Sequence, residues 1–510
     1  MNRSLFPLSM LALAGFAPGF GCQGDFSHQG QGKHLIVTIP ATADVGSPTR
    51  QLAVSVSQAR SFPMRIEAHL PDGTLDTSYG GFVRVSVHPG TVPDLNARNV
   101  QLKAGVADHV TVPVIGAFGD AHIWAEDLGY EPADPSRVPP PQCSDGIDNN
   151  GNGLIDYPAD PGCYAAIDDS EDGGSYSTGI SETLFFELPR VSYVRGYDPQ
   201  DNGNGNATFF PNEQVQVDTG WRGGTTYAFS TIVIRVSSTG FYAQDLQEDL
   251  AMPTGYGGVY AYNFSTPPLM RVCDRLQMLG GTSSDFYGFT ELNYPTWQLE
   301  YWDPPQRPCM VPEPTLLTVA DLQSPNRLWQ LEATLVRVRT TGTMSVHIAQ
   351  HFGPKDVPLV NGAYTPGPDA SNCDFDHNGK INYNDPQEGP CGDACNGTSA
   401  AAPTDPECSE YSAFASQGDF QLIATDSATT AHTRIQGNGS AANGFDPVNG
   451  RGMPVGSFAG TVSYFSGGQQ FTIEARCQDD IVMDPSAPPL PSDVACVHER
   501  TSLDPTPNSQ

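Results

Sequence analysis

The stretch Phe82-Val83-Arg84-Val85-Ser86-Val87-His88 decides the fold, because valines alternate with polar side chains along it. Successive side chains of a β-strand point to opposite faces of a sheet, so alternation marks a strand with one buried face. Similar runs, separated by turn residues, occupy 34–40, 52–58, 64–70, 109–115 and 122–127. This spacing predicts an antiparallel β-sandwich over residues 34–126.

The chain of 510 residues is long enough for several domains and is strongly acidic. It carries 25 Lys and Arg against 57 Asp and Glu, a formal net charge of −32. Such a chain repels phosphate, which argues against a nucleic-acid binder and against docking on an anionic membrane face. After the N-terminus no apolar run reaches the roughly 18 residues of a membrane-spanning helix.

Residues 1–21 have the features of an export signal: an early positive charge, an apolar stretch, and small residues before Cys22. The segment Gly19-Phe20-Gly21-Cys22 resembles the lipobox of bacterial lipoproteins, in which the cysteine becomes the lipid-modified first residue. The resemblance implies an exported outer-membrane lipoprotein, on the cell surface or the periplasmic face, followed by a polar tether at 22–33. Gly19 stands where Leu is usual, so the alternative is ordinary signal cleavage that leaves Cys22 a free thiol.

Eleven cysteines are an awkward number for an exported protein, which pairs its thiols, and lipidation of Cys22 leaves an even ten. The ten fall into sequence-local pairs, although sequence alone cannot fix their connectivity. The disulfides predicted in this way are Cys143–Cys163, Cys273–Cys309, Cys373–Cys391, Cys395–Cys408 and Cys477–Cys496.

Beyond the sandwich, composition predicts a Pro-rich linker, a Cys-bracketed acidic segment, two further β domains and a Pro-rich tail. Their predicted ranges are, in order, 127–142, 143–180, 181–315, 316–482 with an insertion at 352–416, and 483–510. No long amphipathic helix is visible in the sequence, so the whole chain is predicted to be all-β.

Two resemblances refine this prediction. The stretch 72–81, with the valine run after it, resembles the bacterial Ig-like domains of surface proteins. A second set of segments resembles the OB-fold region of secreted bacterial endonucleases; it comprises 231–237, 240–245, 258–262, 276–280 and 285–292, with a weaker echo at 458–464, 471–476 and 479–481. The resemblances imply an Ig-like sandwich followed by a tandem of OB-like β-barrels, without the catalytic nuclease domain.

Residues 374–385 have the spacing of a calcium-binding loop. Calcium takes six to eight oxygen ligands, and a loop curling around the ion supplies them from alternate residues, with Gly at the sharp turn. The ligands predicted here are the side chains of Asp374, Asp376, Asn378, Asn382 and Asp385 and the carbonyl of Lys380. An Asp in the last position makes the loop resemble dockerin repeats.

A second candidate calcium loop lies between Cys143 and Cys163 and resembles the calcium repeats of thrombospondin type 3. Its predicted ligands are Asp148, Asn150, Asn152, the Leu154 carbonyl and Asp156, with Asp160 replacing the carboxylate that the last position lacks. The alternative is a Gly- and Asn-rich turn held only by its disulfide. The acidic run at 168–172 is expected to be a solvated loop.

No catalytic site is predicted. His347 and His351 stand four residues apart without the Glu of a zinc protease, and nucleophile-elbow, phosphate-loop and dinucleotide motifs are missing. Aromatic side chains of the OB-like strands could stack on bases, but residues 228–300 hold three basic and seven acidic side chains, so packing is the simpler role. These aromatics are Phe241, Tyr242, Tyr260, Tyr262, Phe286, Tyr287 and Phe289.

The sequence thus favours a non-catalytic, calcium-stabilised binding or display scaffold of the cell envelope, whose partner is an unknown protein or saccharide. The alternative is a nucleic-acid-binding accessory of a secreted nuclease system, and an unrecognised hydrolase is least favoured. Fold resemblance alone does not assign function.

Overall fold

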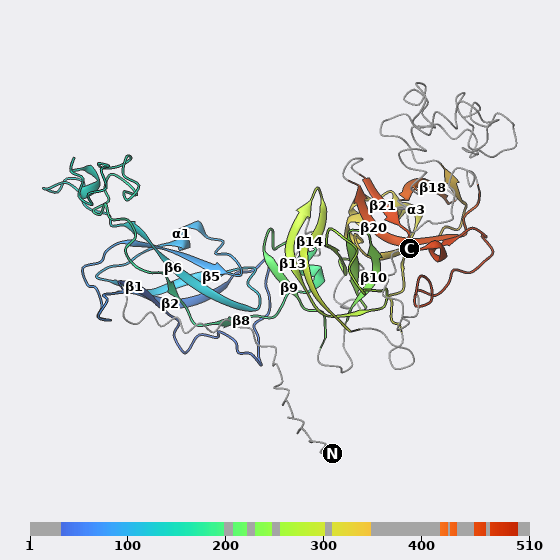
Figure 1. Cartoon of the computed structure of the whole chain (residues 1–510), viewed down its shortest axis with the longest axis horizontal. Helices are drawn as coiled ribbons and strands as arrows, with labels where there is room; N and C mark the ends of the chain where they lie inside the picture. The colour runs from blue at the N-terminus through green and yellow to red at the C-terminus, as the bar shows by residue number, and fades with distance from the viewer. Residues whose placement is uncertain are drawn as a thin grey trace, which may run out of the picture.

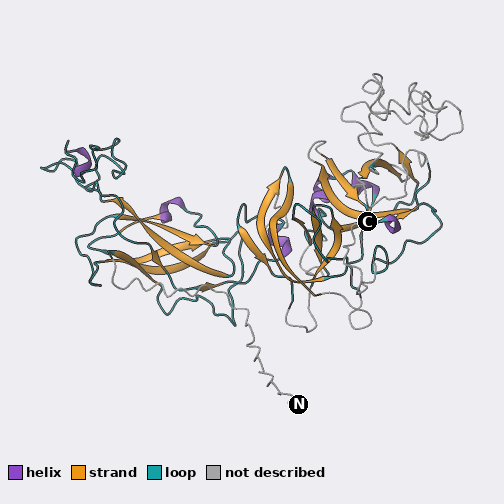
Figure 2. Cartoon of the chain, in the orientation of Figure 1, coloured by secondary structure: helices purple, strands orange, loops and turns teal. Residues whose placement is uncertain are grey.

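The computed structural model describes residues 32–197, 208–221, 230–246, 255–300, 309–347, 419–426, 429–435, 453–465 and 470–497. Within these ranges the chain is all-β, as predicted, with its strands in four sheets (Figure 2). The longest α-helix described has six residues, and none is long and apolar enough to cross a membrane.

The N-terminal unit is a β-sandwich of two sheets around one core (Figure 1). The first sheet has the order β1 (His34–Thr38), β2 (Arg60–His69), β5 (Val106–Val114). The second has the order β4 (Asn99–Gln101), β3 (Phe82–His88), β6 (Asp120–Tyr130), β7 (Gly179–Ile180), with β8 (Leu184–Phe185) also on β6 and α1 (Leu95–Arg98) before β4. The alternating valines of β3 face the core, where Val83 and Val85 are fully buried.

One predicted strand is absent from this sandwich. Residues 52–58 form no strand; Leu52 makes a single bridge to Phe186 and packs in the sandwich core. Val54, two residues later, packs instead with Val191 and Val194 of the next unit. The prediction was wrong because the alternating side chains fill two different cores instead of one sheet face.

The sandwich also extends past residue 126. Strand β6 continues to Tyr130, and the chain returns to β6 through β7 and β8. The boundary predicted at residue 181 therefore falls inside this sheet. Residues 131–178 leave the sandwich and come back to it; we call this excursion the lobe, and Figure 1 shows it projecting from the end of the sandwich.

The middle unit is a single curled sheet. Its strands are β9 (Gln214–Val217), β10 (Thr231–Ser237), β11 (Gly240–Asp245), β12 (Gly258–Tyr262), β13 (Arg275–Phe286) and β14 (Phe289–Glu300), preceded by α2 (Val191–Val194). The order is β10-β11-β12-β14-β13-β9, with β12 and β14 parallel. β10 also pairs with β13 through Ile232 and Arg275, so the sheet closes on itself.

The C-terminal unit repeats this strand order. Its elements are β15 (Thr315–Leu317), α3 (Val319–Leu322), α4 (Pro325–Gln330), β16 (Leu335–Val338), β17 (Met344–His347), β18 (Phe420–Thr425), β19 (Thr430–Ile435), β20 (Ser457–Phe465), β21 (Gln470–Glu474) and β22 (Ile481–Val482). The strands β17, β18 and β19 are neighbours in the sheet, and β19 pairs in parallel with β21. Strand β21 pairs with β20, which pairs in turn with β16, the strand that precedes β17 in the chain. Both units therefore contain one parallel pair at the corresponding place, β12 with β14 in the middle unit and β19 with β21 in the C-terminal unit.

Buried ion pairs connect the middle and C-terminal units. Arg235 of β10 pairs with Glu474 of β21, both about 95% buried, and its guanidinium lies 5.0 Å from the ring centroid of Tyr242. Arg195 pairs with Glu332 at 3.3 Å between Nη2 and Oε1, with both side chains 0% exposed. A charge of this kind is tolerated inside a protein only when it is paired, so the pairs fix how the two units dock.

Three predicted disulfides lie among the described residues, and the structure forms all three: Cys143–Cys163, Cys273–Cys309 and Cys477–Cys496. Their Cα separations of 5.7, 5.2 and 5.6 Å are ordinary for disulfides. The other two predicted pairs, the loop at 374–385 and Cys22 lie outside the described residues.

Candidate metal centre

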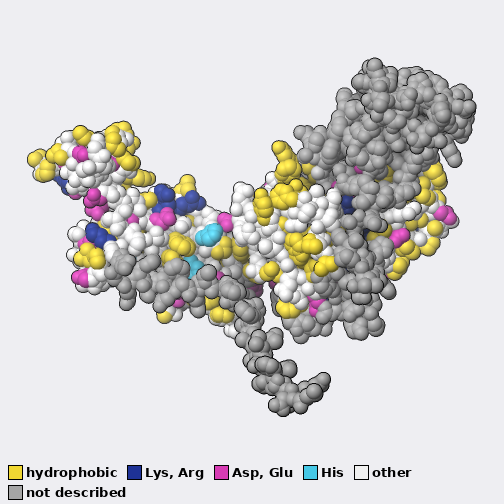
Figure 3. All heavy atoms as spheres, viewed as in Figure 1, with side chains coloured by type: hydrophobic (Ala, Val, Ile, Leu, Met, Phe, Trp, Pro, Cys, Tyr) yellow, Lys and Arg dark blue, Asp and Glu magenta, His cyan; other side chains and the backbone are white. Residues whose placement is uncertain are grey.

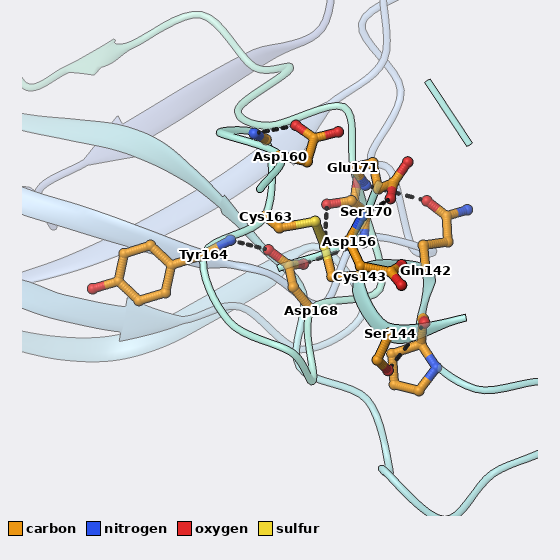
Figure 4. Close-up of a disulfide and its surroundings, with 12 residues drawn as sticks. Gln142, Cys143, Ser144, Asp156, Asp160, Cys163, Tyr164, Asp168, Ser170 and Glu171 are labelled. Atoms are coloured by element: carbon orange, nitrogen blue, oxygen red, sulfur yellow. Dashed lines mark hydrogen bonds between the residues drawn. A yellow bond between two sulfur atoms is a disulfide. The ribbon is translucent and has the colours of Figure 1, made fainter. Parts of the chain in front are cut away.

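The lobe has almost no apolar core. Most of its large hydrophobic side chains are exposed; Ile147, Leu154, Ile155, Tyr157 and Tyr164 are 42–58% exposed, whereas Tyr176, at its end, packs in the sandwich core. The Cys143–Cys163 disulfide is its buried centre, at 0% and 7% exposed (Figure 4). Where the lobe joins the sandwich, Arg137 forms an ion pair with Asp169, and the backbones of Pro132 and Asp168 form an isolated β-bridge. Polar contacts and the disulfide therefore hold the lobe together.

The loop curls around the side-chain carboxylate of Asp148, the predicted first ligand. Its Oδ1 accepts hydrogen bonds from the amides of Gly151 (2.8 Å) and Asn152 (3.1 Å), and its Oδ2 from that of Gly153 (2.8 Å). Gly151 and Gly153 both have positive φ, +76° and +88°, which permits this tight curl. The Asn-Gly-Asn-Gly spacing thus produces the turning loop that the sequence predicts.

Asp160, the predicted substitute ligand, contacts the loop from outside its first turn. Asn150 Nδ2 lies 3.0 Å from Asp160 Oδ2, and Asn152 Nδ2 lies 3.1 and 3.2 Å from its two oxygens. Asp160 is 1% exposed. Both asparagines therefore act as donors to the Asp160 carboxylate here, and they would offer an ion their amide oxygens only after their side chains rotate.

Glu171 is the residue that the sequence prediction missed. The run at 168–172 was predicted to be solvated, but Glu171 is 1% exposed and Asp168 0%. The Glu171 carboxylate accepts from the amides of Asn149 (2.5 Å) and Asp156 (3.2 Å), and its carbonyl accepts from Asn150 Nδ2 (2.5 Å). The prediction was wrong because the fold returns this segment under the loop, beside the disulfide (Figure 4).

Asp168 has a separate, structural role. Its carboxylate accepts the backbone amides of Glu131, Tyr164 and Ser170 at 2.9, 3.0 and 3.2 Å. Burial raises the pKa of Asp168, and these amide donors oppose that rise. Asp168 thereby ties the lobe to the end of β6.

Asp156 supplies an oxygen that lacks a protein partner. Its Oδ2 accepts from the Gly146 amide at 2.9 Å, while its Oδ1 is buried and accepts no hydrogen bond. The predicted ligand Leu154 donates its amide to Asn152 Oδ1 at 2.7 Å, and no described contact engages its carbonyl. A buried oxygen without a donor is costly unless a cation or water satisfies it.

Four carboxylates, those of Asp148, Asp156, Asp160 and Glu171, therefore accept hydrogen bonds from backbone amides or asparagine side chains of the loop. Among the described lysines and arginines, none makes an ion pair with any of them. The donors are carboxylate and amide oxygens, without thiolate or imidazole, which suits hard cations such as calcium and magnesium. Calcium is favoured over magnesium, because calcium accepts irregular sets of oxygen donors and magnesium demands an octahedron.

A second acidic group lies beside a disulfide. Cys477, Asp479 and Cys496 bring potential ligand atoms together. Both sulfurs belong to the Cys477–Cys496 disulfide, so neither is a thiolate. Asp479 accepts the Cys496 amide at 3.2 Å, which gives this cluster a structural explanation.

The aromatic side chains of the middle sheet are mostly core. Phe241, Tyr242, Tyr260 and Phe289 are 0–8% exposed and pack between sheets. Phe286 and Tyr287 are exposed, at 55% and 73%, and Tyr262 is partly buried. The structure therefore buries most of the surface on which a nucleic-acid base could stack.

No protein-family model, curated protein or solved structure matches the chain. The functional argument accordingly proceeds from the residues of the lobe and the surfaces of the three units.

Proposed function

We propose that this chain is an exported, non-catalytic binding or display scaffold of the cell envelope, stabilised by calcium in its lobe. One observation carries the calcium proposal: four carboxylates bond to groups of one short loop, no described lysine or arginine pairs with them, and two of them, Asp160 and Glu171, are 1% exposed. Buried carboxylates are stable when paired with a cation. Asp148, Asp156, Asp160, Glu171 and the two loop asparagines would hold the ion.

The role of the ion is structural. The lobe exposes most of its large apolar side chains and buries a disulfide and polar groups. A bound ion and a disulfide replace the hydrophobic core that so short a segment cannot build. With this ligand set we expect extracellular-grade affinity, about 10⁻⁴ to 10⁻³ M.

The strand order supports the predicted OB-like tandem. In both the middle and C-terminal units three consecutive strands are neighbours, β10–β12 and β17–β19, and the third of them pairs in parallel with β14 or β21. In the middle unit β13 also pairs with β10, whereas in the C-terminal unit β20 pairs with β16. A five-stranded Greek-key arrangement of this kind is that of OB folds. The buried aromatics and the acidic charge favour a scaffold over the nucleic-acid-binding alternative.

Calcium is expected to protect the lobe against amide hydrogen exchange. At about 10 mM calcium the loop should gain about 1–3 kcal/mol against local opening, given the affinity above. Hydrogen exchange of the full mature chain, measured in calcium and in EGTA, reports this directly on residues 146–171. Glu171→Gln should weaken the calcium dependence at least tenfold, and Asp160→Asn should do the same.

Asp172→Asn is the matched control, because Asp172 lies in the same acidic run but is exposed. It should leave the calcium dependence unchanged. Equal exchange of the lobe in EGTA and in 10 mM calcium (a concentration about ten times the weakest expected dissociation constant) would refute the calcium site.

The proposed anchor is tested separately. Expressed in a Gram-negative host, the full chain should fractionate with membranes, with a mature mass that includes acyl groups on Cys22. Cys22→Ser should release it into the soluble exported fraction. Intact mass spectrometry and fractionation provide the readout, and an unacylated mature chain beginning at another residue would contradict the anchor.

A further inference from the structure

Five aromatic rings form a continuous row that runs from a buried interface to solvent. Along Tyr242, Tyr260, Tyr262, Phe264 and Tyr294, successive ring centroids are 4.6, 6.3, 4.4 and 5.1 Å apart. Tyr242 and Tyr260 are 3% and 8% exposed, whereas Phe264 and Tyr294 are 55% and 70% exposed. We call these five residues the aromatic row.

The backbone conformation at the two exposed rings is energetically unfavourable. Phe264 and Tyr294 have φ of +61° and +50°, in the left-handed region. That conformation costs a side-chain-bearing residue about 1–2 kcal/mol, and exposed rings recover little of it by burial. The strain is therefore not explained by core packing.

Local structure holds both rings in place. Phe264 sits in the turn after β12, where the Asn263 amide donates to the Thr239 carbonyl at 2.8 Å and Asn263 Nδ2 donates to the Ser265 carbonyl at 3.2 Å. Tyr294 lies in a β-bulge, since the β13–β14 register shifts between Gly280 and Thr282. Bulges commonly redirect a side chain next to a binding site.

The exposed end of the row is uncharged. Its rings are flanked by Asn263, Ser265 and Asn293. The basic side chains of the middle sheet are engaged elsewhere: Arg235 pairs with Glu474, Arg275 pairs with Glu300 at 3.3 Å, and Arg271 is 2% exposed. Figure 3 shows hydrophobic and uncharged atoms over this unit, with few Lys or Arg among them. Among the described residues of this unit, an anionic ligand would therefore find no free cation to pair with at the row.

The size of the patch excludes a second copy of the chain. Aromatic side chains offer about 150–250 Å² each, so the exposed parts of Tyr262, Phe264 and Tyr294 total about 300 Å². A stable protein interface needs about 800 Å² on each partner. The patch is instead the size of one or two sugar rings.

We propose that the exposed end of the aromatic row binds a neutral, linear polysaccharide. A pyranose ring presents a face of C–H bonds that stacks on an aromatic ring, and its hydroxyl edge accepts and donates hydrogen bonds, as the neighbouring asparagines do. The ring centroids of Tyr262, Phe264 and Tyr294 lie 4.4 and 5.1 Å apart, so the exposed rings form one continuous apolar strip on which such a chain could lie. The rings are tilted by 55° and 40°, which suits a twisting soluble chain rather than a flat crystalline surface.

The inference rests on the proposed binding role and names its ligand class, but it does not depend on calcium. The test is isothermal titration of the full mature chain with cellohexaose, laminarihexaose, maltohexaose and chitohexaose. At least one should bind with a dissociation constant at or below about 1 mM. Phe264→Ala and Tyr294→Ala should each weaken that binding at least about fivefold, the loss of one stacking contact.

Tyr287→Ala is the matched control, because Tyr287 is 73% exposed with φ of +54° but contacts Phe286 outside the row. It should change the affinity less than twofold. The proposal is overturned if no hexasaccharide binds, if Tyr287→Ala weakens binding as much as Phe264→Ala, or if (dT)₁₂ binds more tightly through the row. A dimer in sedimentation that Phe264→Ala abolishes would overturn it too. Calcium protection of the lobe that persists when glycan binding fails leaves the calcium proposal standing.

Discussion

Replacing Arg195 by methionine is expected to lower the free energy of unfolding by about 3–5 kcal/mol at pH 8. Arg195 is fully buried and donates to the carbonyls of Glu332 (2.6 Å), Trp329 (2.9 Å) and Gly258 (3.2 Å). Methionine fills a similar space, but it leaves these three carbonyls without a hydrogen-bond donor and the Glu332 carboxylate without its cation. Urea unfolding of the full chain, followed by tryptophan fluorescence, measures the loss, since Trp329 lies 5.9 Å from the guanidinium.

The matched control is Arg137→Met, which removes the partly exposed pair with Asp169. A surface pair contributes at most about 1 kcal/mol, so this variant should unfold almost as the wild type does. The double variant Arg195→Met/Glu332→Met should recover part of the loss, because it removes the stranded charge as well. If Arg195→Met lowers the free energy of unfolding by less than about 1 kcal/mol, the Arg195–Glu332 pair does not stabilise the contact between the two units.

The β-class of the chain was predictable because alternation depends only on local sequence. Val83 and Val85 alternate with polar residues, and both are buried as the pattern requires. Leu52 and Val54 alternate just as well, yet they serve two cores and form no strand. Periodicity states that a side chain is buried, but which core receives it depends on contacts distant in the sequence.

The disulfides among the described residues were predictable because their partners lie close in sequence. Cys143 and Cys163 are 20 residues apart, and Cys477 and Cys496 are 19 apart. The loop from Asp148 to Asp156 was visible for the same reason. Glu171 could not be recognised, because its place beside Asn149 follows from the path of the chain around the disulfide and not from a spacing within the loop.

The contacts between units were beyond sequence reasoning altogether. Arg195 and Glu332 are joined across 137 residues, and Arg235 and Glu474 across 239. No local pattern identifies the distant acid with which a buried arginine will pair. An apolar stretch that contains one basic residue nevertheless indicates that the residue pairs with a buried acid. Arg235 stands in such a stretch, Thr231-Ile232-Val233-Ile234-Arg235-Val236.

Glu332 should make the stability of the molecule fall as pH rises from about 4.5 to about 7. Burial raises its pKa to about 7 from an ordinary 4.5, although the positive charge of Arg195 and the Thr290 amide, which donates at 2.9 Å, both oppose the rise. The folded state therefore binds a proton that the unfolded state has already released in this window. Stability from this group is complete below about pH 4.5 and is lost by the time pH passes 7.

A shift of this size corresponds to about 3 kcal/mol. Glu332→Gln keeps the shape of the protonated acid and removes the titration, so the difference in unfolding free energy between wild type and variant should change by about that amount between pH 4.5 and 7.5. Urea titrations at half-unit pH intervals measure it. Glu182→Gln, at an exposed glutamate, should run parallel to the wild type. Parallel curves for Glu332→Gln would mean that its carboxylate ionises in the folded protein as readily as in the unfolded chain, and that water or Arg195 fully compensates its burial.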